Sequence, residues 1–288
     1  MARIVSKLLV AILIVSTSKA EVKKDIEYGR ADNIPLLLDA YILDRPGSFP
    51  TVIYVHGGGF TGGDKKVVPK PLLDLLPPAG FNLFSINYRL APKYVFPAET
   101  DDVEQAVHYV KRHATEYRVD PNRIALMGAS AGGHLVSFVG AKHEPDNRVA
   151  AVVSFYGEHD LVSRTRPQTD CAVGGHIRHT DEPQPCLSGG LKAFLGIDDL
   201  DPATASIVRG ASPITYISPD MPPYLLFHGT KDLDVPYQQS ILMCGAMKKA
   251  GARCEVITVE GGGHGGWDND PVMQRYQQSM MELLKTNL

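Results

Sequence analysis

The stretch RIALMGASAGGHL, residues 123–135, places one serine, Ser130, among small residues directly after an apolar run. The residues around it match G-x-S-x-G, the pattern of a sharp turn between a strand and a helix. Residues two positions either side of such a serine come close together, so only small side chains fit. The turn lifts the hydroxyl to the sheet edge at a helix N-terminus, where the dipole favours developing negative charge. A glycine-rich turn with an N-cap serine gives a similar pattern, so the pentapeptide alone leaves both interpretations open.

Apolar periodicity predicts an α/β chain. Runs rich in β-branched and aromatic residues alternate with stretches whose apolar residues recur every three or four positions. Strands are expected at residues 25–28, 36–43, 51–56, 82–89, 123–128, 149–157, 223–229 and 254–261, and helices at 97–117, from 130, near 237–250 and from about 273. This alternation implies a mostly parallel sheet with helices on both faces and a ligand site beyond the carboxyl ends of its strands. Residues 163–210 interrupt it, and loops and short helices are expected there at the same edge.

A second glycine-rich motif, HGGGF, follows the third expected strand. Loops of this kind supply oxyanion-hole amides, because glycines let bare N–H groups approach a substrate oxygen. We assign the candidate oxyanion hole to the amides of Gly58, Gly59 and Ala131. His56 is expected to brace this loop rather than to react. A merely flexible loop would not need to start at the end of a buried strand.

A base and an orienting acid are expected at later strand ends, with the acid first in chain order. The segments TKDLDVP and GGGHGGW follow the last two expected strands. His264 is therefore the candidate general base, and only one of Asp232 and Asp234 can face it. We favour Asp232, since Asp234 is better placed to cap the next helix. His228, at the end of its own strand, is interpreted as structural.

Four cysteines suggest two disulfides in a chain that enters an oxidising compartment. Three pairings are possible, and geometry favours Cys244 with Cys254. Cys244 lies about a turn and a half before Gly251, the expected helix end, and Cys254 opens a strand that runs back along that helix. Cys171 and Cys186 would then close a polar loop.

The same loop allows an alternative, a zinc site formed by Cys171, His176, His179 and Cys186. Their spacing is not a known zinc pattern, and export favours the disulfide. No metal ligand is therefore assigned, and no cofactor is expected.

The first twenty residues have the pattern of a cleaved signal peptide. Arg3 and Lys7 precede an apolar run from Leu8 to Val15, and small residues precede a cleavage site near Ala20. The run is shorter than the ~20 apolar residues of a spanning helix, so no stable membrane anchor is expected. We predict a signal peptide over residues 1–20, one catalytic domain over 21–288, and a secreted or periplasmic protein.

The composition suits an ordinary soluble domain, with 288 residues of which 44% are hydrophobic and 21% charged. The net charge of −3 becomes more negative by three units when Arg3, Lys7 and Lys19 are removed. No basic patch indicates nucleic acid or an anionic membrane as a partner. Oligomeric state is left open.

Seven motifs together resemble one protein family. They are YRLAP at 88–92, FPAETDD at 96–102, ASPITYIS at 211–218, HGTKDLDVPYQQS at 228–240, and the HGGGF, GASAGGHL and GGGHGGW motifs. The chain resembles the α/β-hydrolase esterases, and above all the hormone-sensitive-lipase-like and bifunctional feruloyl and acetyl xylan esterase group. The resemblance covers almost the whole mature chain. It implies the α/β-hydrolase fold, the acid at Asp232, and the oxyanion amides at Gly58, Gly59 and Ala131.

The implied function is hydrolysis of short-chain acyl esters through an acyl-enzyme on Ser130. Candidate substrates are small esters and acetyl or feruloyl esters of plant polysaccharide. The lipase-like relatives often carry an N-terminal helical cap, whereas only about thirty residues separate Ala20 from the strand at 51–56. A large lid is therefore not expected, and the 163–210 segment is the expected determinant of substrate choice.

Two other classes of function remain open at this point. One is a serine peptidase or arylformamidase-type amide hydrolase of the same fold, although a prolyl-oligopeptidase-type enzyme would carry a propeller that this sequence lacks. The other is a catalytically inactive, glycan-binding homologue. Ester against amide hydrolysis separates the first from an esterase, and glycan binding without turnover identifies the second.

Overall fold

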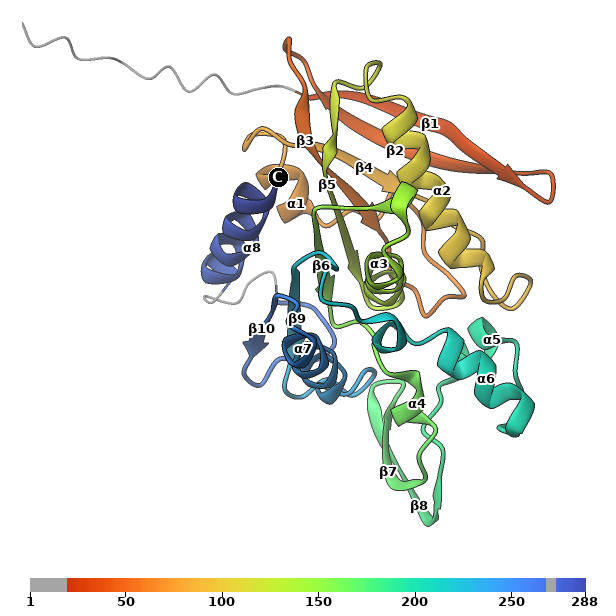
Figure 1. Ribbon diagram of the computed structural model, residues 1–288. Helices are drawn as coiled ribbons and strands as arrows, with labels where there is room; N and C mark the ends of the chain where they lie inside the picture. Colours follow the sequence, from red (N-terminus) through yellow and green to blue (C-terminus); the bar gives the residue numbers. More distant parts are fainter. Residues whose placement is uncertain (1–19, 268–272) are drawn as a thin grey trace, which may run out of the picture.

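The computed structural model describes residues 20–267 and 273–288, so the predicted signal peptide lies outside the described residues apart from Ala20. A central sheet is covered by helices on both faces (Figure 1). Its strands are β1 (Ala20–Ala31), β2 (Ile34–Leu43), β3 (Phe49–Val55), β4 (Asn82–Ile86), β5 (Val119–Ala129), β6 (Ala151–Phe155), β9 (Tyr224–Gly229) and β10 (Cys254–Val259). The helices that flank it are α1 (Lys70–Leu75), α2 (Ala98–Arg112), α3 (Ala131–Lys142), α7 (Gln238–Ala250) and α8 (Met273–Asn287).

The eight strands lie in the order β1-β2-β4-β3-β5-β6-β9-β10. From β4 to β10 all neighbours are parallel, whereas β1 and β2 form an antiparallel hairpin that joins the sheet at β4. The predicted, mostly parallel sheet is confirmed. Strand order reverses at β3, which lies between β4 and β5, and Val55 at its end is paired with Gly128 of β5. Ligand sites of such sheets form at this reversal.

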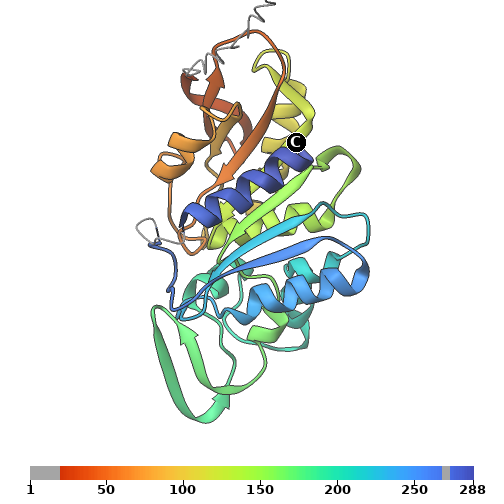
Figure 2. The ribbon, with the colours of Figure 1, turned by 90° about the vertical axis from the view of Figure 1, so that its left-hand side faces the viewer.

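Two hydrophobic cores lie on the two faces of the sheet. Apolar residues of α2, α3 and α7 pack on one face, and those of α1 and α8 pack on the other. Figure 2 shows α8 lying across the sheet on its own side. The apolar stripe predicted for residues 97–117 is the buried face of α2, with Val103, Val107 and Val110 fully buried. That helix ends at Arg112 rather than Tyr117, because the chain turns through Arg118 at a positive φ of 53° and enters β5.

The segment 163–210 differs from the sequence expectation, because it contains a β-hairpin as well as short helices. Strands β7 (Gln168–Val173) and β8 (His176–Gln184) form this hairpin, hereafter the arm, which extends beyond the sheet (Figure 1). The neighbouring helices are α4 (Leu161–Arg164), α5 (Gly189–Leu195) and α6 (Pro202–Gly210). Gly174 and Gly175 connect the two strands with φ values of 62° and 79°. Such a two-glycine turn matches the twist of a hairpin, and this local signal was overlooked.

Both favoured disulfides are present in the structure. Cys171 of β7 is bonded to Cys186, which closes the base of the arm. Cys244 of α7 is bonded to Cys254 at the start of β10, with their Cα atoms 5.3 Å apart. The zinc alternative is wrong, because its two cysteine ligands are joined to each other.

One buried carboxyl group has no hydrogen-bond partner among the described residues. Glu99, in the first turn of α2, is fully buried, and neither of its carboxyl oxygens has a hydrogen-bond partner in the described part of the chain. Burial raises the pKa of Glu99 to about 8, and the nearby Asp102 adds to the shift. The folded protein therefore holds this carboxyl in its neutral form over a pH range in which the unfolded chain ionises it.

The substitution Glu99→Gln should change how stability depends on pH. A pKa raised from 4.5 to about 8 in the folded state stabilises the fold below pH 4.5, and this contribution is lost as the pH rises to 8. The free energy of unfolding of the variant relative to the wild type should rise by about 1.4 kcal/mol per pH unit across this window and then level off. Chemical denaturation at several pH values measures it, with Glu255→Gln on exposed β10 as the control. A flat difference curve would contradict the assignment.

Candidate active site

The turn after β5 holds Ser130 in a strained backbone conformation. Its φ of 54° and ψ of −120° are sparsely populated for a non-glycine residue. The Ser130 N–H donates to Phe155 O at 2.9 Å, which ties the turn to β6. A side chain at Gly132 would collide with the carbonyl of Val55, and one at Gly128 with the carbonyl of Gly132. The small residues predicted around the serine are therefore required by close backbone packing.

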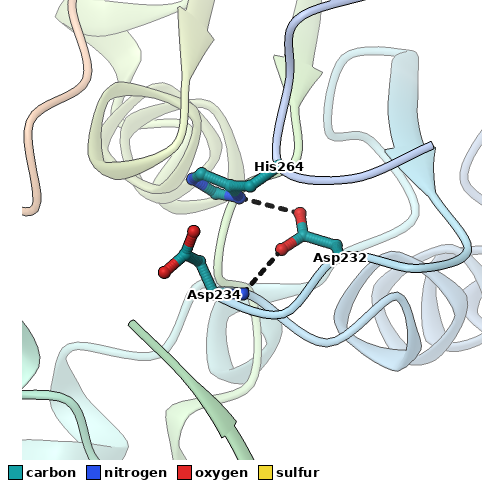
Figure 3. A group of neighbouring side chains, drawn as sticks. All are labelled: Asp232, Asp234 and His264. Atoms are coloured by element: carbon teal, nitrogen blue, oxygen red, sulfur yellow. Dashed lines mark hydrogen bonds and ion pairs between the residues drawn. The ribbon is translucent and has the colours of Figure 1, made fainter. Parts of the chain in front are cut away.

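The structure brings Ser130, His264 and Asp232 together in one hydrogen-bonded chain. His264 Nε2 lies 2.9 Å from Ser130 Oγ, and His264 Nδ1 lies 2.7 Å from Asp232 Oδ2. Each residue follows a different parallel strand, so three strand ends build the group. Figure 3 shows the imidazole directed at the Asp232 carboxylate. The geometry fits a nucleophile, a base and an acid that fixes the imidazole tautomer.

Asp232 is held as a buried carboxylate by several donors. Burial raises the pKa of Asp232. The contacts with His228, His264 and the Val235 N–H lower it by more than burial raises it, so the pKa lies well below its usual range. His228 Nε2 lies 3.3 Å from Asp232 Oδ2, and its Nδ1 lies 2.8 Å from Ser240 Oγ. The sequence interpretation of His228 as merely structural missed this contact. A negative charge is therefore available to stabilise an imidazolium at His264.

Asp234 does not cap the following helix, which corrects the sequence expectation. The N-cap residue of α7 is Tyr237, and it makes no side-chain capping bond. The Asp234 N–H instead donates to Asp232 Oδ1 at 2.9 Å, and its carboxylate turns toward His264 (Figure 3). Asp232, Asp234 and His264 offer ligand atoms within 4.8 Å of one another, the spacing of a possible cation site. Two of the three are already bonded to each other, so no metal role is assigned.

The candidate oxyanion residues line the same cleft as Ser130. Gly58 and Gly59 have φ values of 132° and 60°, which suit glycine, and their N–H groups donate to no acceptor in residues 20–267 and 273–288. Ala131 begins α3, so its N–H has no acceptor inside the helix. His56 stacks on Tyr88 with ring centroids 4.4 Å apart, as expected for a residue that braces this loop.

A buried lysine fixes the chain just beyond the glycine loop. Lys65 is 1% exposed, and its ammonium lies 2.6 Å from Asp39 and 2.8 Å from Asp25. Its carbonyl accepts a hydrogen bond from Ser85 Oγ of β4. The loop is thereby anchored to β1, β2 and β4, so its amides are preorganised. The sequence analysis missed Lys65, because nothing local to it indicates burial.

Ser130, His264, Ala131 and the glycine loop line an open cleft of about 830 Å³. Apolar residues of the 64–69 loop form part of its wall, and Val173 and Gly174 of the arm reach it. The cleft is also lined by Tyr156 and Glu158, which follow β6 and which the sequence analysis did not single out. Their position after a parallel strand was the available signal. The described residues before β3 form β1 and β2, with no helical cap among them.

Arg164 connects the arm to the loop that carries the acid. It is 2% exposed, and its Nε lies 3.3 Å from the buried Glu158 carboxylate. Its Nη2 donates to Ala172 O of β7 and to Asp234 O, and Cys186 N–H donates to its carbonyl. One side chain therefore joins the disulfide-closed base of the arm to the loop that carries Asp232.

Comparison with known proteins agrees with this geometry. Residues 38–247 match the BD-FAE family model. The chain belongs to the BD-FAE family. This BD-FAE protein has the α/β-hydrolase fold of the esterases that it resembles structurally, which confirms the predicted fold class.

Curated and solved relatives of this BD-FAE protein include several esterases. It is 35% identical over 226 residues to the probable carboxylic ester hydrolase LipM of Mycobacterium tuberculosis, covering 74% of this chain and 48% of LipM. Among solved structures it is similar to an acetyl ester-xyloside bifunctional hydrolase from Caldicellulosiruptor lactoaceticus, at 26% identity, with a TM-score of 0.73 and coverage of 94% and 97% of the two chains. Thermogutta terrifontis esterase 2, solved phosphonylated by cyclosarin, gives 26%, a TM-score of 0.72 and coverage of 94% and 95%. The chain spans about half the length of the curated relatives it matches.

Removing one partner of the Glu158–Arg164 pair should destabilise this BD-FAE protein strongly. Arg164→Met leaves a buried carboxyl without its cation, and we expect a loss of about 3 kcal/mol in the free energy of unfolding. The double variant Glu158→Gln/Arg164→Met should lose less than the sum of the two single variants. Urea denaturation measures all three.

Arg166→Met is the matched control, because Arg166 is exposed two residues away. Its stability should stay within about 0.5 kcal/mol of the wild type. Equal losses for the two arginine variants would show that the buried pair does not hold the arm.

Proposed function

We propose that the protein is a serine carboxylesterase that hydrolyses short-chain acyl esters. The observation that carries this proposal is the continuous chain from Ser130 Oγ through His264 to Asp232, placed at an open cleft that Gly58, Gly59 and Ala131 also line. The named esterases among its relatives support the same class of reaction. Neither the fold nor the cleft would require this alignment in a binding module.

The reaction passes through an ester on the serine. His264 Nε2 takes the hydroxyl proton as Ser130 Oγ attacks the ester carbonyl, and Asp232 stabilises the resulting imidazolium. The amides of Gly58, Gly59 and Ala131 donate to the oxyanion of the tetrahedral intermediate. The imidazolium returns the proton to the departing alcohol. His264 then takes a proton from water as the water attacks the acyl-enzyme. Return of that proton to Ser130 Oγ releases the acid and restores the serine.

Short acyl groups on small alcohols or on polysaccharide are the proposed substrates. The described residues before β3 carry no helical cap, and named relatives include a carbohydrate esterase and an acetyl ester-xyloside hydrolase. We further propose that the protein acts outside the cytoplasm after cleavage near Ala20, since both disulfides favour an oxidising compartment. Among the described helices, none has the length and apolar character to cross a bilayer.

The substitution Ser130→Ala should abolish turnover. Removal of the nucleophile should reduce kcat/KM for p-nitrophenyl acetate by at least about a thousandfold, because no acyl-enzyme can form. Release of p-nitrophenol measures the rate, and circular dichroism checks the fold. Equal activity in the variant would rule out the mechanism.

The rate of hydrolysis should fall as the acyl chain of the ester becomes longer. We expect kcat/KM to fall from p-nitrophenyl acetate through butyrate to decanoate, since a short-acyl cleft excludes long chains. Acetylated xylan and methyl ferulate are assayed alongside to show whether the protein removes acetyl or feruloyl groups. Hydrolysis of peptide or aryl amides without hydrolysis of esters would instead favour the amide hydrolase, and glycan binding without turnover would indicate an inactive homologue.

A further inference from the structure

Asp234 places a second carboxylate beside the imidazole, outside the triad itself. It is partly exposed and lines the cleft. Its N–H and carbonyl bond to Asp232 and Arg164, so the backbone is fixed on both sides. The carboxylate oxygens have no hydrogen-bond or ion-pair partner within residues 20–267 and 273–288. A fixed backbone therefore presents an unpaired charge at the reaction centre.

The position of this carboxylate relates it to one half of the substrate. His264 Nε2 must return a proton to the leaving alcohol oxygen, so that oxygen lies about 3 Å from Nε2 during the reaction. An oxygen of Asp234 lies within 4.8 Å of a His264 ring nitrogen, and Figure 3 shows it turned toward the ring. Groups two or three bonds beyond the leaving oxygen, such as a hydroxyl on the neighbouring carbon, can therefore come within hydrogen-bonding reach of Asp234.

The other groups around the cleft leave this charge uncompensated. No lysine or arginine is among the described residues that line it. The one other acidic side chain of the lining outside the triad, Glu158, is already paired with Arg164. The lining also includes Thr61, Ser188, Gly189 and Gly190, which are small and neutral. A carboxylate in such surroundings attracts a hydrogen-bond donor and repels an anion.

We propose that Asp234 is a specificity-determining residue that accepts a hydrogen bond from a hydroxyl group on the alcohol half of the substrate. The preferred substrates are then monoesters of diols and polyols whose free hydroxyl neighbours the ester. Esters with an anionic alcohol half are disfavoured. This inference rests on the proposed esterase function and names the part of the substrate that the cleft selects.

The test compares acetate esters that differ in the alcohol alone, so that every reaction passes through the same acetyl-enzyme. Ethylene glycol monoacetate is paired with n-propyl acetate, which replaces the hydroxyl by a methyl group. Acetylcholine is paired with its neutral carbon isostere as a probe of charge. The values of kcat/KM are measured for the wild type, Asp234→Ala and Asp234→Asn. Asp44→Asn, which removes an equally charged, exposed group at the other end of the sheet, is the control.

The wild type should prefer the glycol ester over the propyl ester by about tenfold or more, the effect of one hydrogen bond to a charged group. Asp234→Ala should abolish that preference, and Asp234→Asn should retain part of it because an amide oxygen still accepts. Both variants should lose any preference in kcat/KM for acetylcholine over its neutral carbon isostere. Asp44→Asn should keep the wild-type ratios for both substrate pairs.

Equal ratios in the wild type and Asp234→Ala would overturn the role of Asp234 while leaving the esterase function intact. A preference for the ammonium ester that exceeds the preference for the hydroxyl ester, and that disappears in Asp234→Asn, would overturn the polyol assignment in favour of a cationic alcohol. Failure of the wild type to hydrolyse p-nitrophenyl acetate would overturn the esterase function and this inference with it.

Discussion

The strained backbone of Ser130 is the constraint on which the arrangement of the cleft depends. A conformation of this kind costs about 1–3 kcal/mol and persists only where neighbouring elements over-determine it. Here β5 lies at the centre of the sheet, the Ser130 N–H is bonded to β6, and Gly132 lies against the carbonyl of Val55 at the end of β3. The same contacts that force the turn also place the hydroxyl between the glycine loop and the histidine. Strain and positioning therefore have one origin.

Parallel pairing explains why distant segments meet at this turn. The carboxyl ends of β3, β5, β6, β9 and β10 share one edge of the sheet, and each is followed by a loop that contributes to the cleft. The supporting groups near this edge are ion pairs whose cations are buried, although Asp25 itself is exposed. Lys65 is held between two aspartates under the glycine loop, and Arg164 is held beside Glu158 under the acid loop. Both sides of the cleft are thus fixed by charges that are matched inside the protein.

Sequence reasoning succeeded where local chemistry determined the structure. Motif order and strand-end position were enough to place Ser130 and His264 together with one of Asp232 and Asp234, and apolar periodicity was enough for the parallel sheet. The choice of Asp232 was right, although the helix-capping role expected of Asp234 was not. It failed where a residue's environment is created by distant segments. Lys65 and Arg164 each depend on partners from other elements, and their own neighbours in the chain give no sign of burial. His228 was placed at the end of a predicted strand, but its contact with Asp232 was not foreseen. Asp234 was misplaced because a helix start nearby offered a simpler local role, and the arm because its composition outweighed its two-glycine turn.

The base of the arm has a consequence for how such a protein can diversify. The disulfide and Arg164 hold the base of the arm against the acid loop, while its tip, the turn at Gly174 and Gly175, is exposed, and Gly174 lines the cleft. Substitutions and insertions in the tip can therefore reshape the mouth of the cleft without moving Asp232. Homologous proteins can therefore differ in the residues of the tip that contact a ligand, while the base of the arm and the catalytic chemistry stay the same.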